Sequence, residues 1–263
     1  RRVSGSVGRL RALGAPCISE SDCVRQGTAK SPQCRIVATH EQLGASRGGQ
    51  TGLHATVKVL VGECTGEYWV PKLQALGWGR MWIARGRNIY TYPGEPWGLD
   101  NGAFRDWKDG VPFDGDQFAR VIEKAEKHPP PYLAVLPDIP GGGLASYELS
   151  MSWLDRVPAF PWHLAVQDGM EPADVDPSLF SGLFLGGTNA YKATAAMWCD
   201  FAHASGLRFH YGRCGTQAKI AHAIDIGADS IDSAVAMWTK PRWRVFRDSL
   251  TIGPSQSDMF YRE

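Results

Sequence analysis

Acidic and amide side chains stand directly after several short apolar segments of this chain. These residues are Asp100, Asp138, Gln167 and Asp232. If the segments are adjacent parallel strands, their carboxyl ends bring three carboxylates and one amide to one end of a sheet. Converging carboxylates raise one another's pKa and are costly unless they are used. The pattern therefore indicates a site for nucleophilic and acid–base chemistry.

Each of these residues also has a purely structural interpretation. Asp100, with Asn-Gly after it, is typical of a turn, and Asp138 before Ile-Pro-Gly can cap one. Gln167 can satisfy backbone groups of a loop, and Asp232 can cap the next helix. We favour the site because all four residues occur at the ends of predicted strands.

Glycines and aromatic residues near the same strand ends fit glycosyl transfer at a purine. One carboxylate can attack the anomeric carbon, and a second can move the proton of the departing and incoming base. A third can read the N1 and N2 donors of guanine, while Gln167 and a glycine N–H read O6. Gly186, Gly187 and Gly212 leave backbone accessible, and Phe104 and Tyr211 are candidates for stacking on the base, worth roughly 1–3 kcal/mol per base. Tight turns and ordinary core packing are the alternatives.

Eight short apolar segments alternate with helical stretches, which is typical of a parallel α/β architecture. The predicted strands are 58–63, 81–85, 98–100, 133–138, 163–167, 182–185, 208–212 and 230–232. Eight such strands close most economically into a single-domain (β/α)8 TIM barrel; an open doubly wound sheet is the alternative. Helices are predicted over 68–76, 115–127, 146–157, 191–204 and 216–226, and the connection 86–97 is the one that looks helix-free.

The composition of the chain changes near residue 57. Residues 1–57 contain none of the ten Trp, eight Tyr and ten Phe, and they hold eight Lys or Arg against three Asp or Glu. We predict that residues 1–56 are a disordered or non-native leader and that the barrel domain covers 57–263; a basic arm for nucleic acid is the alternative. The rest of the chain is mildly acidic, so a nucleic-acid enzyme of this kind needs a local basic patch.

The cysteines and the hydropathy of the chain narrow the class of protein. Six cysteines show no C-x-x-C pair and no zinc-ligand spacing with histidine, so we expect reduced thiols, no metal and no other cofactor. No apolar run approaches the length of a membrane span. The cytoplasm is the expected location.

Six motifs occur in a fixed order along the predicted strands. They are Asp-Asn-Gly-Ala-Phe (100–104), Leu-Pro-Asp (136–138), Val-Gln-Asp-Gly (166–169), Leu-Gly-Gly (185–187), Tyr-Gly-Arg-Cys-Gly-Thr (211–216) and Ile-Asp-Ser (231–233). This set resembles the queuine and archaeosine tRNA-guanine transglycosylase superfamily. Those barrels carry D-S-G-G-[FY], a strand-four Asp, V-Q-G-G, a Gly-Gly after strand six and a nucleophilic F-D on strand eight. The likeness covers about residues 97–235.

The resemblance implies a role for each matching residue. Asp232 would be the nucleophile that bonds to the sugar C1′, and Asp100 would transfer the proton. Asp138, Gln167 and Gly187 would read the base. The aromatic residues of the matching motifs, Phe104 and Tyr211, would pack on its faces.

Three departures from the family pattern indicate whether the nucleic-acid substrate is DNA or tRNA. The tRNA-directed enzymes have a C-terminal zinc site of Cys and His, but neither residue type follows Asp232 here. Residues 234–238 replace a P-T-R-type segment, and Asn101 stands where Ser is usual. These differences favour the short relatives that insert 7-deazaguanines into DNA, found in phages and bacterial DNA-modification clusters. DNA is therefore expected over tRNA, with a 7-deazaguanine base as the second substrate and with additional DNA-modification subunits as candidate partners.

The segment 240–247 interleaves cations with aromatic residues. Lys240, Arg242, Arg244 and Arg247 suit contact with phosphates. The alternative is a solvated helix whose Trp and Phe enter the core. Two other functions stay open for the whole chain: a barrel for a small phosphorylated metabolite, with 212–216 at the phosphate, and a non-catalytic binding protein.

Overall fold

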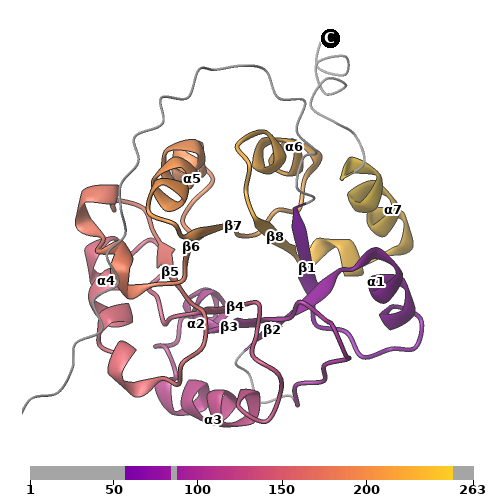
Figure 1. Ribbon diagram of the computed structural model, residues 1–263, viewed down its shortest axis with the longest axis horizontal. Coiled ribbons are helices and arrows are strands. Elements are labelled where there is room, and N and C mark those ends of the chain that lie inside the picture. The colour runs from indigo at the N-terminus through magenta and orange to yellow at the C-terminus, as the bar shows by residue number, and fades with distance from the viewer. Residues whose placement is uncertain (1–56, 84–87, 251–263) are drawn as a thin grey trace, which may run out of the picture. The chain divides into compact units, whose positions relative to one another are not determined.

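Eight parallel strands form a closed barrel in chain order, and the last strand pairs with the first. The computed structural model describes residues 57–83 and 88–250. Helices surround the ring of strands (Figure 1). The TIM-barrel prediction is confirmed, and the open-sheet alternative is wrong. The predicted leader, residues 1–56, lies outside the described residues.

The strands follow the apolar segments closely. They are β1 (Lys58–Gly62), β2 (Gly79–Ile83), β3 (Gly98–Asp100), β4 (Leu133–Val135), β5 (Trp162–Val166), β6 (Gly182–Leu185), β7 (Arg208–Tyr211) and β8 (Ser230–Ser233). β2 begins two residues before its prediction. β4 ends three residues before its prediction, next to a segment in which Pro137 has no N–H to donate to a neighbouring strand.

All five predicted helices are present, and two further α-helices occur. The predicted ones are α1 (Val70–Leu76), α3 (Gly115–Ala125), α4 (Leu144–Met151), α5 (Ala195–Ala204) and α6 (Gln217–Asp225). The others are α2 (Ala103–Lys108), and α7 (Lys240–Ser249), which had been the structural alternative for that cationic segment. The prediction that only 86–97 lacks a helix was incomplete. Residues 88–97 contain none, but the β5–β6 connection also has only two 3-10 turns, each beginning at a proline, Pro172 and Pro177.

Alternation along each strand separates an inner from an outer core. Inside the barrel a small buried cluster is formed by Leu60, Met81, Leu133, Val135 and Ala165. The outer core packs between strands and helices and is much larger. Because successive side chains point to opposite faces, polar residues at strand ends alternate between the cavity and the outer core.

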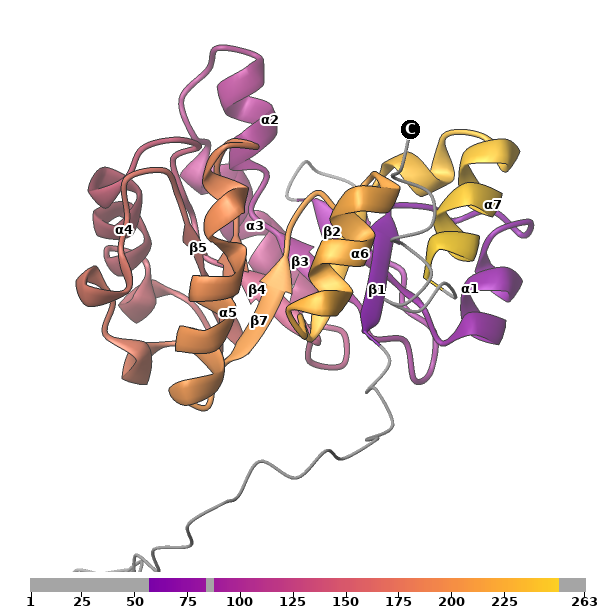
Figure 2. The same ribbon diagram turned by 90° about the horizontal axis from the view of Figure 1, so that it is seen from above.

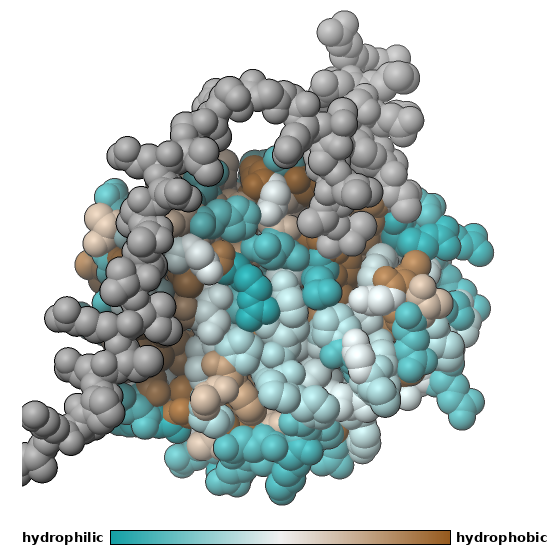
Figure 3. Space-filling view, in the orientation of Figure 1, coloured by the Kyte–Doolittle hydropathy of each residue, from teal (hydrophilic) through white to brown (hydrophobic). Residues whose placement is uncertain are grey.

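Aromatic side chains pack the last helix, α7, against the first helix, α1. On α7, Trp243 and Phe246 are buried, and they contact Trp69 and Trp78 at the two ends of α1 with ring centroids 5.0–5.7 Å apart. Hydrophilic residues occupy most of the face seen in Figure 3, and hydrophobic ones gather there only in small groups. Within residues 57–83 and 88–250, none of the helices is both long and apolar enough to span a bilayer.

A buried ion pair holds the helix-free β2–β3 connection. The guanidinium of Arg80 on β2 donates to both carboxylate oxygens of Glu95, at 2.5 and 2.6 Å. It also donates to the backbone oxygens of Cys64 and Tyr90. Arg80 is 2% exposed, so its charge depends on these partners.

We expect Arg80→Met to lower the free energy of unfolding by about 3–5 kcal/mol, because it leaves the Glu95 carboxylate buried without its partner. Urea unfolding measures this. The exposed pair Arg105–Asp109 on α2 is the control, since its atoms are 3.7 Å apart and Arg105→Met should cost less than about 1 kcal/mol. Equal effects for the two variants would contradict the assignment.

Candidate active site

A cavity of about 310 Å³ opens at the carboxyl ends of the strands. Seven of the residues predicted for the site line it: Asp100, Phe104, Asp138, Gln167, Gly186, Gly187 and Asp232. They come from β3, β8 and the segments that follow β3, β4, β5 and β6. Barrel closure therefore brings these distant positions to one mouth, where α2 projects beyond the other helices (Figure 2).

Asp232 lies on β8 with one carboxylate oxygen held from two sides. Its Oδ1 accepts from His210 Nε2 at 3.1 Å and from the backbone N–H of Arg213 at 2.7 Å. A carboxylate can only accept, so His210 Nε2 carries the hydrogen of this contact, and Nδ1 on the other side of the ring lies 2.8 Å from Ser230 Oγ. Both contacts use Oδ1, and 17% of the Asp232 side chain stays exposed at the cavity.

Asp100 ends β3, and its partly buried carboxyl group lines the cavity mouth. Its Oδ1 accepts from the Gly102 N–H at 2.7 Å, in a turn of the kind that Asp-Asn-Gly predicts. Burial raises the pKa of Asp100 to about 7, and the nearby charges of Asp232 and Asp138 act in the same direction. A group with this pKa can give and take a proton near neutral pH.

Asp138 is clamped by two amides. Asn101 Nδ2 donates to its Oδ1 at 2.8 Å, and Gln167 Nε2 donates to its Oδ2 at 2.5 Å. Burial raises the pKa of Asp138 to about 6, and the two hydrogen bonds and the charge of Arg213 oppose that rise. Both oxygens are thus fixed in place with lone pairs left for a ligand's donors.

The amide of Gln167 also ties two loops together. Its Oε1 accepts from the N–H groups of Gly141 and Gly187, at 3.1 and 2.9 Å. The Gly187 N–H predicted to read a base is therefore already used inside the protein. Gly186 has a packing role, because a Cβ there would lie 2.5 Å from Gln167 Nε2.

Phe104 and Arg213 form one wall of the cavity. The Arg213 guanidinium lies 4.4 Å from the centre of the Phe104 ring and donates to the Gly187 carbonyl. The Trp107 ring is stacked beside the Phe104 ring, with ring centroids 5.8 Å apart and planes 28° from parallel. The rings are 43% and 57% exposed, so they stand at the rim.

Tyr211 and Gly212 are not brought to the cavity. Tyr211 is 2% exposed, and its ring packs in the outer core against His222 of α6 and the ammonium of Lys192. On β7 the inward side chain is the preceding residue, His210, because strand side chains alternate. Gly212 packs against Phe184, where a Cβ would lie 2.6 Å from the ring.

The four predicted nucleic-acid contacts divide along α7. Lys240 and Arg242 lie in its first turn, and Arg242 lines a second cavity next to α6. Arg247 lies near the far end of the helix and pairs with Asp248 at 2.7 Å. Arg244 is exposed and lines neither cavity.

Sequence reasoning did not assign His210 and Arg213 to the group of residues around the three carboxyl groups. The alternation of side chains along a strand could have identified His210. It pairs in register with Ser230, and Ser230 points to the same face of β8 as Asp232, two residues later. The sequence contains no comparable signal for Arg213. Its backbone has a left-handed φ of 54°, a conformation that an arginine in a sequence does not predict. Among the residues that the structure describes, no three His, Cys, Asp or Glu side chains are grouped to hold a metal ion.

Comparison with known proteins adds no identification. The chain matches no protein-family model, and the curated proteins contain no significant match to it. The chain is a TIM-barrel protein with a cavity of three carboxyl groups at the end where such barrels carry their active sites.

The raised pKa of Asp100 predicts a pH-dependent stability. The folded protein holds this proton more tightly than the unfolded chain, whose pKa is near 3.8, so stability from this group falls as pH rises from about 4 to about 7. Asp100→Asn removes that loss while keeping the oxygen that faces Gly102. We expect the variant to be more stable than the wild type at pH 8, by on the order of 2–4 kcal/mol, and to lose this advantage at pH 4.

Urea unfolding at both pH values measures the difference. Asp176→Asn is the control, because hydrogen bonds from Ser178 lower the pKa of this exposed carboxyl group. Its substitution should therefore bring no gain at pH 8. A wild type and Asp100→Asn variant that respond identically to pH would contradict the assignment.

Proposed function

We propose that this chain is a base-exchange glycosyltransferase that replaces guanine in nucleic acid with a 7-deazaguanine such as preQ0. The observation that carries the proposal is one cavity with three carboxyl groups in three different environments. One accepts from His210, one retains its proton near neutral pH, and one is clamped by two amides. These environments suit a nucleophile, a proton carrier and a base reader, respectively.

The first half of the reaction removes guanine. A carboxylate oxygen of Asp232 attacks C1′ of the nucleotide, and the bond from C1′ to N9 of guanine breaks. Asp100, in its neutral form, gives its proton to the departing base and becomes a carboxylate. The His210 and Arg213 N–H groups hold Asp232 in the attacking orientation.

The second half installs the new base. The Asp100 carboxylate takes the proton from N9 of the incoming 7-deazaguanine, and this nitrogen attacks C1′ as the bond to Asp232 breaks. The sugar configuration is retained after two displacements. Asp100 is neutral again and Asp232 is a carboxylate, so the site returns to its starting state.

Recognition of the base falls to Asp138 and Gln167. The clamped carboxylate offers lone pairs to the N1 and N2 donors of guanine. Gln167 uses one Nε2 hydrogen on Asp138, and its second is free of that contact and suits O6. This assignment replaces Gly187 as the reader of O6, because its N–H is held by Gln167.

The preference for DNA over tRNA rests on the motif departures. Ala234–Trp238 stands in place of the P-T-R-type segment of the tRNA-directed enzymes, and Asn101 replaces their usual Ser. Asn101 is also one of the two amides that fix Asp138. tRNA is retained as the alternative substrate.

Release of radiolabelled guanine tests the proposal. DNA or tRNA carrying the label is incubated with the full chain and preQ0 or preQ1. We expect release from DNA, no release with Asp232→Asn, and release slowed by about 10²–10⁴-fold with Asp100→Asn. Asp176→Asn is the matched control and should release guanine at the wild-type rate.

A covalent adduct gives an independent readout. Mass spectrometry of the wild type incubated with DNA in the absence of an incoming base should detect the nucleic acid bonded to Asp232. Release from tRNA alone would keep the chemistry and change the substrate. Unimpaired release by Asp232→Asn would reject the mechanism.

A small phosphorylated metabolite is the second candidate substrate. The observation in its favour is a cation-lined cavity of about 550 Å³ beside the start of α6. In that case a sugar phosphate should raise the melting temperature, while no guanine is released from either nucleic acid.

A further inference from the structure

Four exposed aromatic rings stand on the segments that follow β1, β3 and β8. Tyr68, Phe104, Trp107 and Trp238 are 46%, 43%, 57% and 63% exposed. In a parallel barrel all these segments lie at the carboxyl face, the same face as the cavity. Large rings left this open to solvent at the mouth of a site are candidates for binding.

Cations cover three of these rings, and each contact is close. The ammonium groups of Lys72 and Lys240 lie 3.7 and 5.0 Å from the centre of the Tyr68 ring. The Arg242 guanidinium lies 4.9 Å from the Trp238 ring. The contact on the third ring, described above, joins Arg213 to Phe104 at 4.4 Å. Positive charge and π surface therefore alternate along the face.

The contacts connect into one path. Lys240 and Arg242 are neighbours in the first turn of α7, so the pairs at Tyr68 and Trp238 adjoin. Arg242 and Arg213 line the same cavity between α6 and α7. Arg213 also contacts Phe104, which stacks with Trp107 at the rim of the base cavity. We call the four rings and the cations over them the aromatic–cation track.

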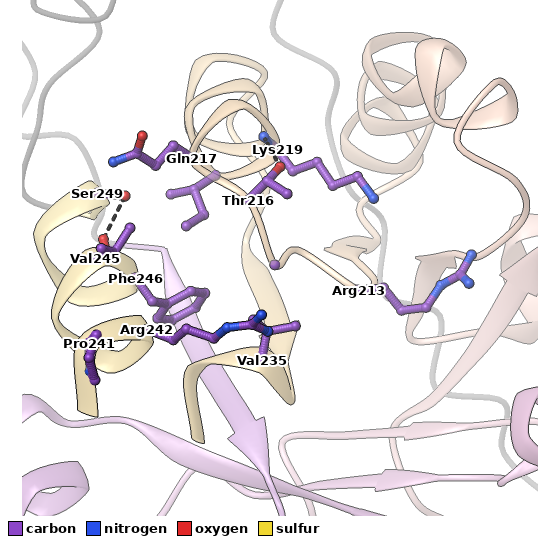
Figure 4. A pocket seen from close by; sticks show the side chains of 12 residues that line it. Arg213, Thr216, Gln217, Lys219, Val235, Pro241, Arg242, Val245, Phe246 and Ser249 are labelled. Atoms are coloured by element: carbon purple, nitrogen blue, oxygen red, sulfur yellow. Dashed lines mark hydrogen bonds between the residues drawn. The ribbon is translucent and has the colours of Figure 1, made fainter. Parts of the chain in front are cut away.

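The cavity that joins the two halves of the track is positively charged. Figure 4 shows Arg213 from the β7–α6 loop, Lys219 from α6 and Arg242 from α7 around it. No carboxylate is among its lining residues. Arg213 and Lys219 line this one cavity, and burial, together with the charge of Arg213, lowers the pKa of Lys219. A bound anion offsets the charge of both cations.

We propose that the aromatic–cation track binds a single-stranded nucleic acid, with a backbone phosphate in the cavity between α6 and α7. Exposed rings can stack on unpaired bases, and the cations beside the rings can contact the phosphates that join those bases. Paired bases in a duplex keep their faces stacked on one another. Binding of the single strand does not depend on the proposed function. The inference rests on that function only where it concerns exchange of a base in the bound strand.

Fluorescence anisotropy with a labelled mixed-sequence DNA oligonucleotide, single-stranded or annealed to its complement, tests the track on the full chain. We expect the single strand to bind at least about tenfold more tightly than the duplex. Tyr68→Ala and Trp238→Ala, which lie outside the base cavity, should each weaken single-strand binding by roughly fivefold or more. Trp238→Phe should restore most of the affinity lost in Trp238→Ala.

Salt dependence separates charge from stacking. Lys72→Ala and Lys240→Ala should each make the slope of log K against log salt less steep by about 0.7. Lys127→Ala and Met197→Ala, at exposed positions beyond the end of α3 and on α5, are the controls and should bind as the wild type does.

Three results would overturn the track: a duplex bound as tightly as the single strand, unchanged binding by both ring variants, or equal competition by a poly-glutamate peptide. Asp232→Asn separates this inference from the proposed function. If that variant binds the single strand normally while even the wild type releases no guanine, the track stands and base exchange fails.

Discussion

The first and last strands are joined by four residue pairs, from Lys58–Ser230 to Val61–Ser233. This pairing places Asp232 at the end of a strand that would otherwise be an open edge. It also brings the charge of Asp232 close enough to raise the pKa of Asp100, which belongs to the third strand. The chemistry of the cavity therefore depends on closure of the barrel, and a sheet left open between β1 and β8 would separate the two carboxyl groups.

Most of the fold could be predicted from the sequence because its strands are short, apolar and separated by turn residues. All eight strands and five helices were located this way. Short helix α2 was not, since Ala103–Lys108 has too few residues for a helical period to emerge. The β5–β6 connection was misjudged because two prolines begin isolated 3-10 turns rather than a helix.

The lining of the cavity was predictable where it depends on residue type at a strand end, as with Asp100, Asp138 and Asp232. It was less predictable where the direction of a side chain decides. Tyr211 and His210 are adjacent on one strand, and only strand register shows that the histidine points into the barrel, where it contacts Asp232. Gly187 shows a second limit, because a sequence does not reveal that its N–H is already bound by Gln167.

Arg213 holds a left-handed backbone that most non-glycine residues avoid, at a cost of about 1–3 kcal/mol. Its side chain borders both cavities. Burial raises the pKa of Asp138 in one cavity and lowers that of Lys219 in the other, and the charge of Arg213 opposes the first shift and adds to the second. An anion bound beside Arg213 would offset both effects, so proton uptake by these two groups would accompany its binding. By thermodynamic reciprocity, protonation of Asp138 would then change the affinity for that anion. One guanidinium thus acts on a titratable group in each cavity.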